Sequence, residues 1–299
     1  MPPISRRRFV QVSAGVAAVA ALAVGDVGII SEPNHPKLVR IEIPLSRWPA
    51  AFDGFTIAQL SDFHYDDYFS IVPIRAAIEM VNQLHADLVV LTGDFITVPV
   101  LADYLHNTKR AIMTAEPCAN LLSALRARLG TVAVLGNHDA NAGGPPIIEI
   151  LQSHGIPVLC NRSIPIERGG ARFWLSGVDD VLDGNPDLDL TLRGIPQGEA
   201  VVVLVHEPDF AKQVARYPVD LQLSGHSHGG QVWIPGIGAP WLPALSRKYP
   251  RGLYRIGALT LYTNIGLGTI HVPIRLNCPP EVTLFTLRAA SGRDQQPKG

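Results

Sequence analysis

Cysteine is scarce in this chain of 299 residues. Cys118, Cys160 and Cys278 lie far apart, and no two of them have C-x-x-C spacing. Thiolate zinc sites and disulfide frameworks both need cysteines at short, regular spacings. The sequence therefore indicates neither, and we expect the three cysteines to be small buried apolar residues.

Charge is also sparse. Charged residues make up 17% of the chain, and the formal net charge is −1. Outside the N-terminus there is no stripe of lysine and arginine. Proteins that bind nucleic acids neutralise phosphates with such stripes. We therefore expect no nucleic-acid partner.

No segment of the chain has the composition of a linker. Neither a Gly/Ser-rich nor a charged stretch divides its middle, and no internal repeat appears. Hydrophobic residues make up 47% of the chain, which at this length is enough for a full-sized core. The sequence predicts one domain over residues 31–290 and a polar tail over residues 291–299.

The N-terminus has the pattern of an export signal. Three arginines precede an Ala/Val-rich run over residues 12–24, and no acidic residue occurs before Asp26. The segment SRRRFVQ resembles the twin-arginine pattern, and the run of about 13 residues is shorter than the roughly 20 that span a bilayer comfortably. We interpret residues 1–30 as a twin-arginine-type signal peptide, cut after Ala23, or as an uncleaved anchor that associates with the membrane.

From Phe55 onward, short apolar runs end in polar clusters, and helical stretches follow several of them. The runs are FTIAQL, ADLVVL, TVAVL, AVVVLV and DLQL, and the clusters after them contain SDFH, TGD, GNHD, HE and SGHSH. Continuous Val/Leu/Ile runs are typical of strands buried on both faces. Strands that alternate with helices predict an α/β sheet, whose ligands bind beyond the carboxyl ends of the strands.

Three segments have helical spacing, and three others alternate. We expect helices over Ile71 to Leu84, Ala119 to Leu129 and Pro145 to His154. The runs at residues 171–178, 258–264 and 281–287 resemble antiparallel or edge strands and suggest a second sheet.

The polar clusters supply metal-ligand side chains. Carboxylates, imidazoles and an amide oxygen without thiolates are typical of a site for divalent transition metals. The two carboxylates, the amide of Asn137 and four histidines besides His138 exceed the three protein ligands of a typical single catalytic zinc, so two metals fit better. The candidate ligands are Asp62, His64, Asp94, Asn137, His206, His226 and His228. The histidines at 35, 85, 106, 154 and 271 do not follow strand-like runs, and we expect them to be ordinary surface or hydrogen-bonded histidines.

The motifs DFH, GDF, GNHD, HEPD and GHSH, in this order, resemble the five signature motifs of the calcineurin-like metallophosphoesterases. Further along, GGQVWIPGIGAP, KYPRGLY and PIRLNCPPEVTLFTL resemble the bacterial YkuE-like exported phosphodiesterase subgroup. One position departs from that subgroup: the chain has Ile265 where an arginine is expected, so a substrate contact by an arginine there is in doubt.

The resemblance implies a four-layer α/β/β/α sandwich with two mixed sheets. It implies one metal on Asp62, His64 and His228, a second on Asn137, His206 and His226, and Asp94 bridging the two. It leaves His138 free to protonate the leaving group, and we expect Asp139 to orient that ring.

The predicted function is an exported, dinuclear metal-dependent phosphodiesterase that hydrolyses phosphate esters by attack of a metal-bridging hydroxide. The two divalent cations would be Mn, Fe or Zn. A phosphomonoesterase of the same fold is the alternative; a nuclease and a non-catalytic metal-binding scaffold are less favoured. The expected partners are a phosphate ester, such as a cell-envelope or lipid-linked phosphodiester, and the twin-arginine export machinery. The expected location is the periplasm, the cell wall or the outer face of the cytoplasmic membrane.

Overall fold

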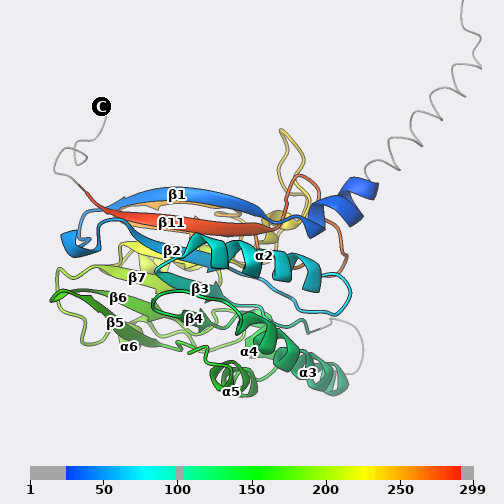
Figure 1. Ribbon diagram of the computed structural model, residues 1–299, viewed down its shortest axis with the longest axis horizontal. Helices are drawn as coiled ribbons and strands as arrows, with labels where there is room; N and C mark the ends of the chain where they lie inside the picture. The colour runs from blue at the N-terminus through cyan, green and yellow to red at the C-terminus, as the bar shows by residue number, and fades with distance from the viewer. Residues whose placement is uncertain (1–24, 99–103, 291–299) are drawn as a thin grey trace, which may run out of the picture.

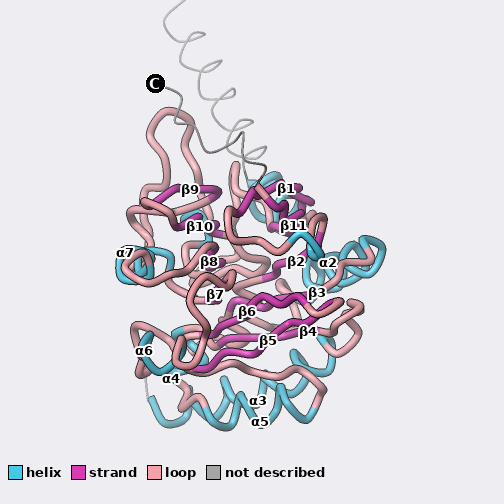
Figure 2. The backbone as a smooth tube through the Cα atoms, turned by 90° about the vertical axis from the view of Figure 1, so that its left-hand side faces the viewer, coloured by secondary structure: helices cyan, strands magenta, loops and turns pink. Residues whose placement is uncertain are grey.

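The computed structural model describes residues 25–98 and 104–290. The twin-arginine pattern, the apolar run and the polar tail lie outside these residues. Two mixed sheets stack face to face (Figures 1 and 2). The first has the order β1 (Lys37–Leu45), β11 (Glu281–Ala289), β2 (Phe55–Leu60), β3 (Leu88–Thr92), β4 (Thr131–Val134). The second has the order β5 (Arg162–Arg168), β6 (Ala171–Gly177), β7 (Val201–Leu204), β8 (Leu221–Ser224), β10 (Leu259–Thr263), β9 (Gly252–Ile256).

Helices cover the outer faces of both sheets. They are α2 (Ile71–Leu84), α3 (Tyr104–Leu122), α4 (Asn137–Asn141) and α5 (Pro145–Ser153) near the first sheet, and α6 (Leu188–Thr191) and α7 (Ala211–Val214) on the second. Single turns of other helix types are η1 (Asp26–Ser31), η2 (Glu32–Asn34), η3 (Ala50–Phe52), η4 (Pro208–Phe210) and η5 (His228–Gly230). The predicted four-layer α/β/β/α sandwich is thus confirmed. Within the described ranges, no helix has the length and apolarity required to cross a bilayer.

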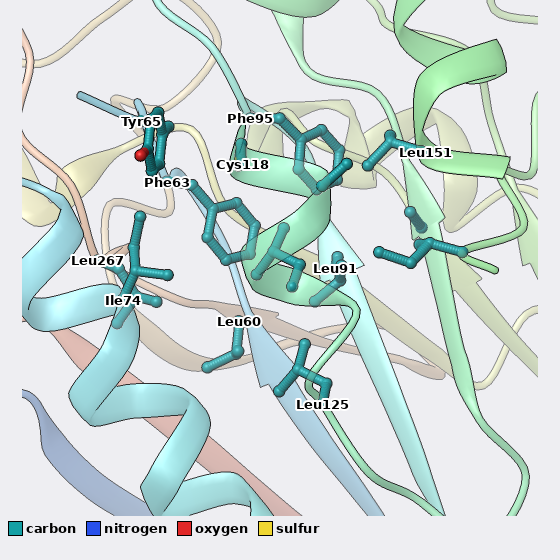
Figure 3. Close-up of a cluster of buried hydrophobic side chains, with 14 of the residues drawn as sticks. Leu60, Phe63, Tyr65, Ile74, Leu91, Phe95, Cys118, Leu125, Leu151 and Leu267 are labelled. Atoms are coloured by element: carbon teal, nitrogen blue, oxygen red, sulfur yellow. The ribbon is translucent and has the colours of Figure 1, made fainter. Parts of the chain in front are cut away.

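The alternation of side chains along β2 and β3 explains the layers. Phe55 and Ile57 of β2 point into the core between the two sheets, whereas Ala58 and Leu60 point into the core beneath the helices. This second core also contains Ile74 of α2 and Leu91 of β3 (Figure 3). Both faces of these strands are buried, which is why their sequences are continuous apolar runs.

The alternating runs have antiparallel partners, but none of them lies at an edge. β6 pairs antiparallel with β5, β10 with β9, and β11 with β2. β11 also pairs in parallel with β1 and so belongs to the first sheet, while β6 and β10 belong to the second. The expectation of antiparallel or edge strands is therefore met by antiparallel pairing, and the sequence did not reveal β1, β5 and β9, which lie at edges of the sheets.

Two further expectations need correction. The helix expected over Ala119 to Leu129 is the end of α3, which ends at Leu122 and contains Pro117. Proline leaves the carbonyl four residues earlier without its helical partner, and that residue here, Met113, is 75% exposed, so water can bond the carbonyl. Cys118 and Cys278 are buried as expected, but Cys160 is exposed.

Candidate metal centre

Loops at the carboxyl ends of five parallel strands carry the predicted ligands. Asp62 and His64 follow β2, Asp94 follows β3, and Asn137 begins α4 just after β4. In the second sheet, His206 follows β7, and His226 and His228 follow β8. These strand ends lie at the right of Figure 1, opposite the end where β11 finishes. All seven predicted ligands are therefore at one end of the sandwich.

The carboxylate of Asp94 joins two groups of ligand atoms. Asp62, His64, Asp94 and His228 form one buried group, and Asp94, His206 and His226 form the other. Atom Oδ2 of Asp94 lies 3.4 Å from Nε2 of His64 and 3.2 Å from Nε2 of His206. The other oxygen, Oδ1, accepts a hydrogen bond from the backbone N–H of His138. Asp94 is thus held in place by one oxygen and shared between the two groups by the other.

Side-chain atoms in the first group converge on a common point. Nε2 of His64 and Nε2 of His228 are 3.0 Å apart, and Nε2 of His228 is 3.3 Å from Oδ1 of Asp62. Two imidazoles and a carboxylate at these separations point ligand atoms at the same space. Such donors suit a divalent transition metal.

Asn137 adds an amide oxygen to the second group. Its Oδ1 is buried and has no hydrogen-bond partner among the described residues. A buried amide oxygen without a partner costs free energy unless a cation or a donor binds it. The carboxylates, imidazoles and this oxygen therefore fit a pair of divalent cations.

Three of the ligand histidines are oriented through the nitrogen that faces away from the centre. Nδ1 of His64 bonds to Oγ1 of Thr97 (2.9 Å), and Nδ1 of His206 bonds to the carbonyl of Thr92 (2.5 Å). Nε2 of His226 bonds to the carbonyl of Ala244 (2.7 Å). Such outer bonds fix the tautomer and the ring orientation of a metal-binding histidine. The sequence offered no signal for these partners, because two of them are backbone carbonyls.

Burial and neighbouring charges shift the pKa values of the ligands in both directions: burial alone would lower the pKa of His206, but Asp94 outweighs it and raises that pKa well above its ordinary value. Burial, with a smaller effect of His206, lowers the pKa of His226 to about 3, and burial and His64 lower the pKa of His228 well below its ordinary value. Burial alone would raise the pKa of Asp94, but His206 and His138 outweigh it and hold that pKa well below its usual range. Neutral imidazoles and an ionised bridging carboxylate are the forms that bind cations.

Five of the ligand residues have a backbone conformation that non-glycine residues rarely adopt. The φ angles are 51° at Asp62, 41° at His64, 57° at Asp94, 68° at His226 and 50° at His228. The left-handed region costs an L-residue roughly 1–2 kcal/mol. Strain of this kind gathers at functional sites, where the surrounding fold maintains it.

Two glycines allow the ligand loops to pack closely. A Cβ at position 136 would lie 2.4 Å from Oδ1 of Asp94, and one at 225 would lie 1.9 Å from Oγ of Ser61. The glycine of GHSH therefore permits the loop after β8 to approach the loop after β2. Positive φ angles in this turn occur at His226, His228, Gly229 and Gly230.

His138 lies beside the first group and is oriented by a residue that the sequence did not indicate. Its ring centroid is 5.0 Å from that of His64, and its Nδ1 accepts a hydrogen bond from the backbone N–H of Val98 (3.0 Å). Burial lowers the pKa of His138 to about 4. A neutral ring that accepts at Nδ1 carries its proton on Nε2.

Asp139 bonds to backbone groups. Its carboxylate accepts from the N–H groups of Phe95, Ile96 and Gly136, at 3.0, 3.3 and 3.0 Å, and thereby ties α4 to the loop after β3. We expected this carboxylate to orient His138. In the structure that orientation comes from Val98, and Asp139 positions the backbone around Asp94.

Position 265 provides no arginine to the centre. Ile265 is buried, and beneath its loop lies Arg275, whose guanidinium is fully buried. Arg275 donates to the carbonyl oxygens of Ile265, Gly268 and Cys278. Because Gly268 N–H in turn donates to the carbonyl of Asp62, Arg275 supports the loop that carries a ligand. The sequence had indicated its segment, PIRLNCPP, but no role for the arginine.

The chain is similar to several known proteins. The chain is 34% identical over 296 residues to the uncharacterized metallophosphoesterase YkuE of Bacillus subtilis, with 97% of this chain and 100% of the relative covered. It is 34% identical over 292 residues to the phosphodiesterase YaeI of Escherichia coli, with 95% and 99% covered. A solved dimetal phosphatase from Danio rerio aligns with a TM-score of 0.41 at 14% identity, over 72% of this chain and 88% of that one. Residues 55–230 match the calcineurin-like phosphoesterase family. The match covers more than half of the chain, and with these relatives it shows that the chain belongs to the calcineurin-like phosphoesterases.

Proposed function

We propose that this metal-dependent phosphoesterase is a dinuclear phosphodiesterase. The observation that carries the proposal is Oδ2 of Asp94, which lies between His64 and His206 and so belongs to both groups of ligand atoms. A shared carboxylate is the usual device for holding two cations about 3.5–4 Å apart. Asp62, His64 and His228 would hold one cation with Asp94. Asn137, His206 and His226 would hold the other.

The residues around the ligands have separate tasks. Bound cations supply an activated water and neutralise charge on phosphoryl oxygens. His138 is not needed as a ligand, and the Nε2–H of its neutral ring is available to donate a hydrogen bond to the departing oxygen of the ester, with the proton itself coming from water. Stabilising the charge that develops on that oxygen is expected to contribute roughly 10²–10⁴ in rate, as acid catalysis at a leaving group does. Val98 keeps the proton on Nε2 by donating to the opposite nitrogen.

A diester is favoured over a monoester by the relative YaeI, whose name describes a phosphodiesterase. The two cations would be Mn, Fe or Zn, which all accept imidazole and carboxylate ligands. Export by the twin-arginine route, to the periplasm, the cell wall or the outer face of the membrane, is part of the proposal. It is supported by the arginine pair and the apolar run of residues 1–24.

The test combines metal analysis with hydrolysis of two synthetic esters. We expect two divalent cations per chain and faster turnover of a bis-aryl phosphate than of the corresponding mono-aryl phosphate. Asp94→Ala should lose both cations and nearly all activity, whereas the exposed control Asp53→Ala should keep both. Preference for the mono-aryl ester would replace the proposal by a phosphomonoesterase. Two bound cations without hydrolysis of either ester would indicate the non-catalytic scaffold.

A further inference from the structure

A pocket of about 470 Å³ opens beside the metal centre. It extends from His64 and Thr97 to Phe69 and Val272 at the surface, and Arg110 and His271 are also among its lining residues. Large exposed apolar side chains surround this opening. We call Ile29, Tyr68, Phe69, Trp241 and Val272 the apolar rim; their exposed fractions run from 45% at Ile29 to 83% at Tyr68.

The members of the apolar rim are neighbours in space although they come from four parts of the chain. Ile29 and Phe69 line one small pocket together. Phe69 and Val272 line the larger pocket, and the ring of Trp241 is 6.1 Å from that of His271, which lines it too. The rim therefore borders the entrance to the metal centre.

Hydrogen bonds hold the rim loops in an exposed arrangement. The carboxylate of Asp66 accepts the backbone N–H groups of Tyr68, Phe69 and Ser70 and so presents two aromatic residues outward. Gln231 donates to the carbonyls of Val272 and Ile274 and accepts from Ile270 N–H.

The segment that carries Ile29 is tied down in the same way. Arg275 N–H donates to the carbonyl of Gly28 (2.8 Å), and the carboxylate of Glu32 accepts from Asn277 and Cys278 N–H. The exposure of the rim is thus built into the fold, and apolar patches of this kind mark binding surfaces.

The chemistry of the rim favours a lipid surface. Tryptophan and tyrosine are enriched where proteins meet the membrane–water interface, and aliphatic side chains enter the acyl boundary. Of the acids on the rim loops, Asp66 and Glu32 are bonded to backbone N–H groups and Asp67 accepts from the Tyr65 hydroxyl. Arg110, which lines the pocket, is the cation available to anionic headgroups.

The sequence before residue 25 also favours a lipid bilayer as the partner of the apolar rim. The apolar run over residues 12–24 ends one residue before Gly25, and Ile29 follows four residues later. Figure 1 shows η1, which contains Ile29, at the same end as the strand ends that carry the ligands. A run that enters a bilayer would therefore bring the rim against that bilayer.

We propose that the apolar rim docks on the surface of an anionic lipid bilayer and holds the entrance of the metal-site pocket against it. Esters with long acyl or alkyl chains would then reach the centre from the membrane. The docking is independent of turnover, but the preference for long-chain esters rests on the proposed phosphodiesterase activity.

The first experiment measures binding of the full chain to vesicles of phosphatidylethanolamine and phosphatidylglycerol by co-sedimentation. Tyr68→Ser/Trp241→Ser removes two rim side chains that do not line the larger pocket. Leu129→Ser/Leu190→Ser removes two exposed leucines outside the rim and serves as the control. We expect the rim variant to bind at least about tenfold more weakly and the control to bind as wild type does. Absence of binding by the wild type would overturn the proposal, and so would equal binding by the rim variant if lipid also fails to quench Trp241 in the measurement below.

A second measurement separates the rim from the N-terminal run, which binds vesicles in any of these variants if it inserts. Brominated phospholipids should quench part of the tryptophan emission of the wild type. Trp241→Phe keeps an aromatic rim and should still bind, but it should lose most of that quenching. Unchanged quenching in this variant would show that Trp241 does not meet the lipid.

The third measurement compares two diesters with the same leaving group, hexadecyl and methyl 4-nitrophenyl phosphate. The wild type should prefer the hexadecyl ester in vesicles, and the rim variant should lose that preference while turning over the methyl ester normally. A loss of both would mean that the substitutions damage the centre. If the metal-loaded wild type hydrolyses neither ester, the proposed activity fails, while the binding and quenching results still decide the docking.

Discussion

The rings of Phe63 and Phe95 stack with centroids 5.2 Å apart and 8° between their planes. Phe63 stands between Asp62 and His64, and Phe95 follows Asp94, so the stack joins the two loops that hold three ligands (Figure 3). Both rings belong to the core beneath the helices. The geometry of the centre therefore depends on packing in a core that contacts no substrate.

We predict that Phe95→Leu weakens metal binding about tenfold, as loss of a supporting contact does at other metal sites. It should also lower the free energy of unfolding by roughly 0.5–3 kcal/mol. Phe173→Leu, in the core between the sheets, is the control: it should cost similar stability and leave metal affinity unchanged. Metal titration of both folded variants checks this, and equal affinities would mean that the stack does not position the ligands.

A second prediction uses the strained backbone of the bridging ligand. Asp94 has φ 57°, so Asp94→Gly should be more stable than Asp94→Ala by about 1 kcal/mol, although both lose the cations. At Asn137, which begins α4, the order should reverse, with glycine less stable than alanine by up to about 1 kcal/mol. Denaturant unfolding of the four variants measures both differences. If alanine were as stable as glycine or more stable at position 94, as it is expected to be at position 137, Asp94 would not be strained.

The sequence predicted the fold from its buried apolar strands, and it predicted the ligands from the polar residues at the carboxyl ends of those strands. Buried strands are continuous apolar runs, and their carboxyl ends must meet at one end of the sheets, so SDFH, TGD, GNHD, HE and SGHSH had to converge. α2 was predicted with the observed bounds because its spacing is regular and no proline lies in its interior beyond the first turn. The bounds of α3 were predicted wrongly because a proline usually marks the end of a helix. Here α3 continues through Pro117, and the carbonyl that loses its partner belongs to an exposed residue.

The supporting interactions could not be predicted in this way. Val98 and Thr92 act through backbone N–H and C=O groups, which every sequence contains. Asp139 next to His138 suggested a pair of side chains, yet its carboxylate turns to three backbone N–H groups. Such roles depend on where loops cross in space, and residue types alone do not specify that.

A third prediction concerns pH. Burial raises the pKa of Glu281 above its ordinary 4.5, against the opposing effect of hydrogen bonds from Thr283 and Tyr262. The folded protein therefore holds this proton more tightly than the unfolded chain does. This contribution to stability is fully present below pH 4.5 and is lost as the pH rises through the raised pKa. Glu281→Gln keeps the acceptor and removes the titration.

The stability of Glu281→Gln relative to the wild type should thus increase with pH above about 4.5. Unfolding free energies of both proteins across the pH range measure this, and taking their difference cancels titration of the metal ligands. A difference that does not change with pH would contradict the raised pKa of Glu281.

The fourth prediction tests export. Replacing Arg6 and Arg7 together by lysine keeps the positive charge and removes the arginine pair, so the protein should stay in the cytoplasm. Fractionation of cells that express the two forms gives the measurement. A variant at Arg8, outside the pair, should be exported normally. Normal export of the double lysine variant would reject the twin-arginine route.

The fifth prediction separates His138 from Asn137, which are adjacent in α4 but have different surroundings. Oδ1 of Asn137 is buried without a partner, whereas the His138 ring is held by Val98 with its proton on Nε2. Asn137→Ala should weaken binding of one cation and regain activity in excess metal. His138→Ala should keep both cations and lose roughly 10²–10⁴ in turnover at any metal concentration.

The size of the His138→Ala defect should depend on the ester. A leaving group with a low pKa departs as an anion and needs no proton, so the variant should hydrolyse such an ester almost as well as the wild type. The deficit should increase as the leaving-group pKa increases, because the unassisted alkoxide becomes a poorer leaving group. Rates for a series of aryl and alkyl diesters, with wild type and variant at equal metal content, measure this slope. A deficit of the same size throughout the series would show that His138 positions the substrate and does not act on the departing oxygen.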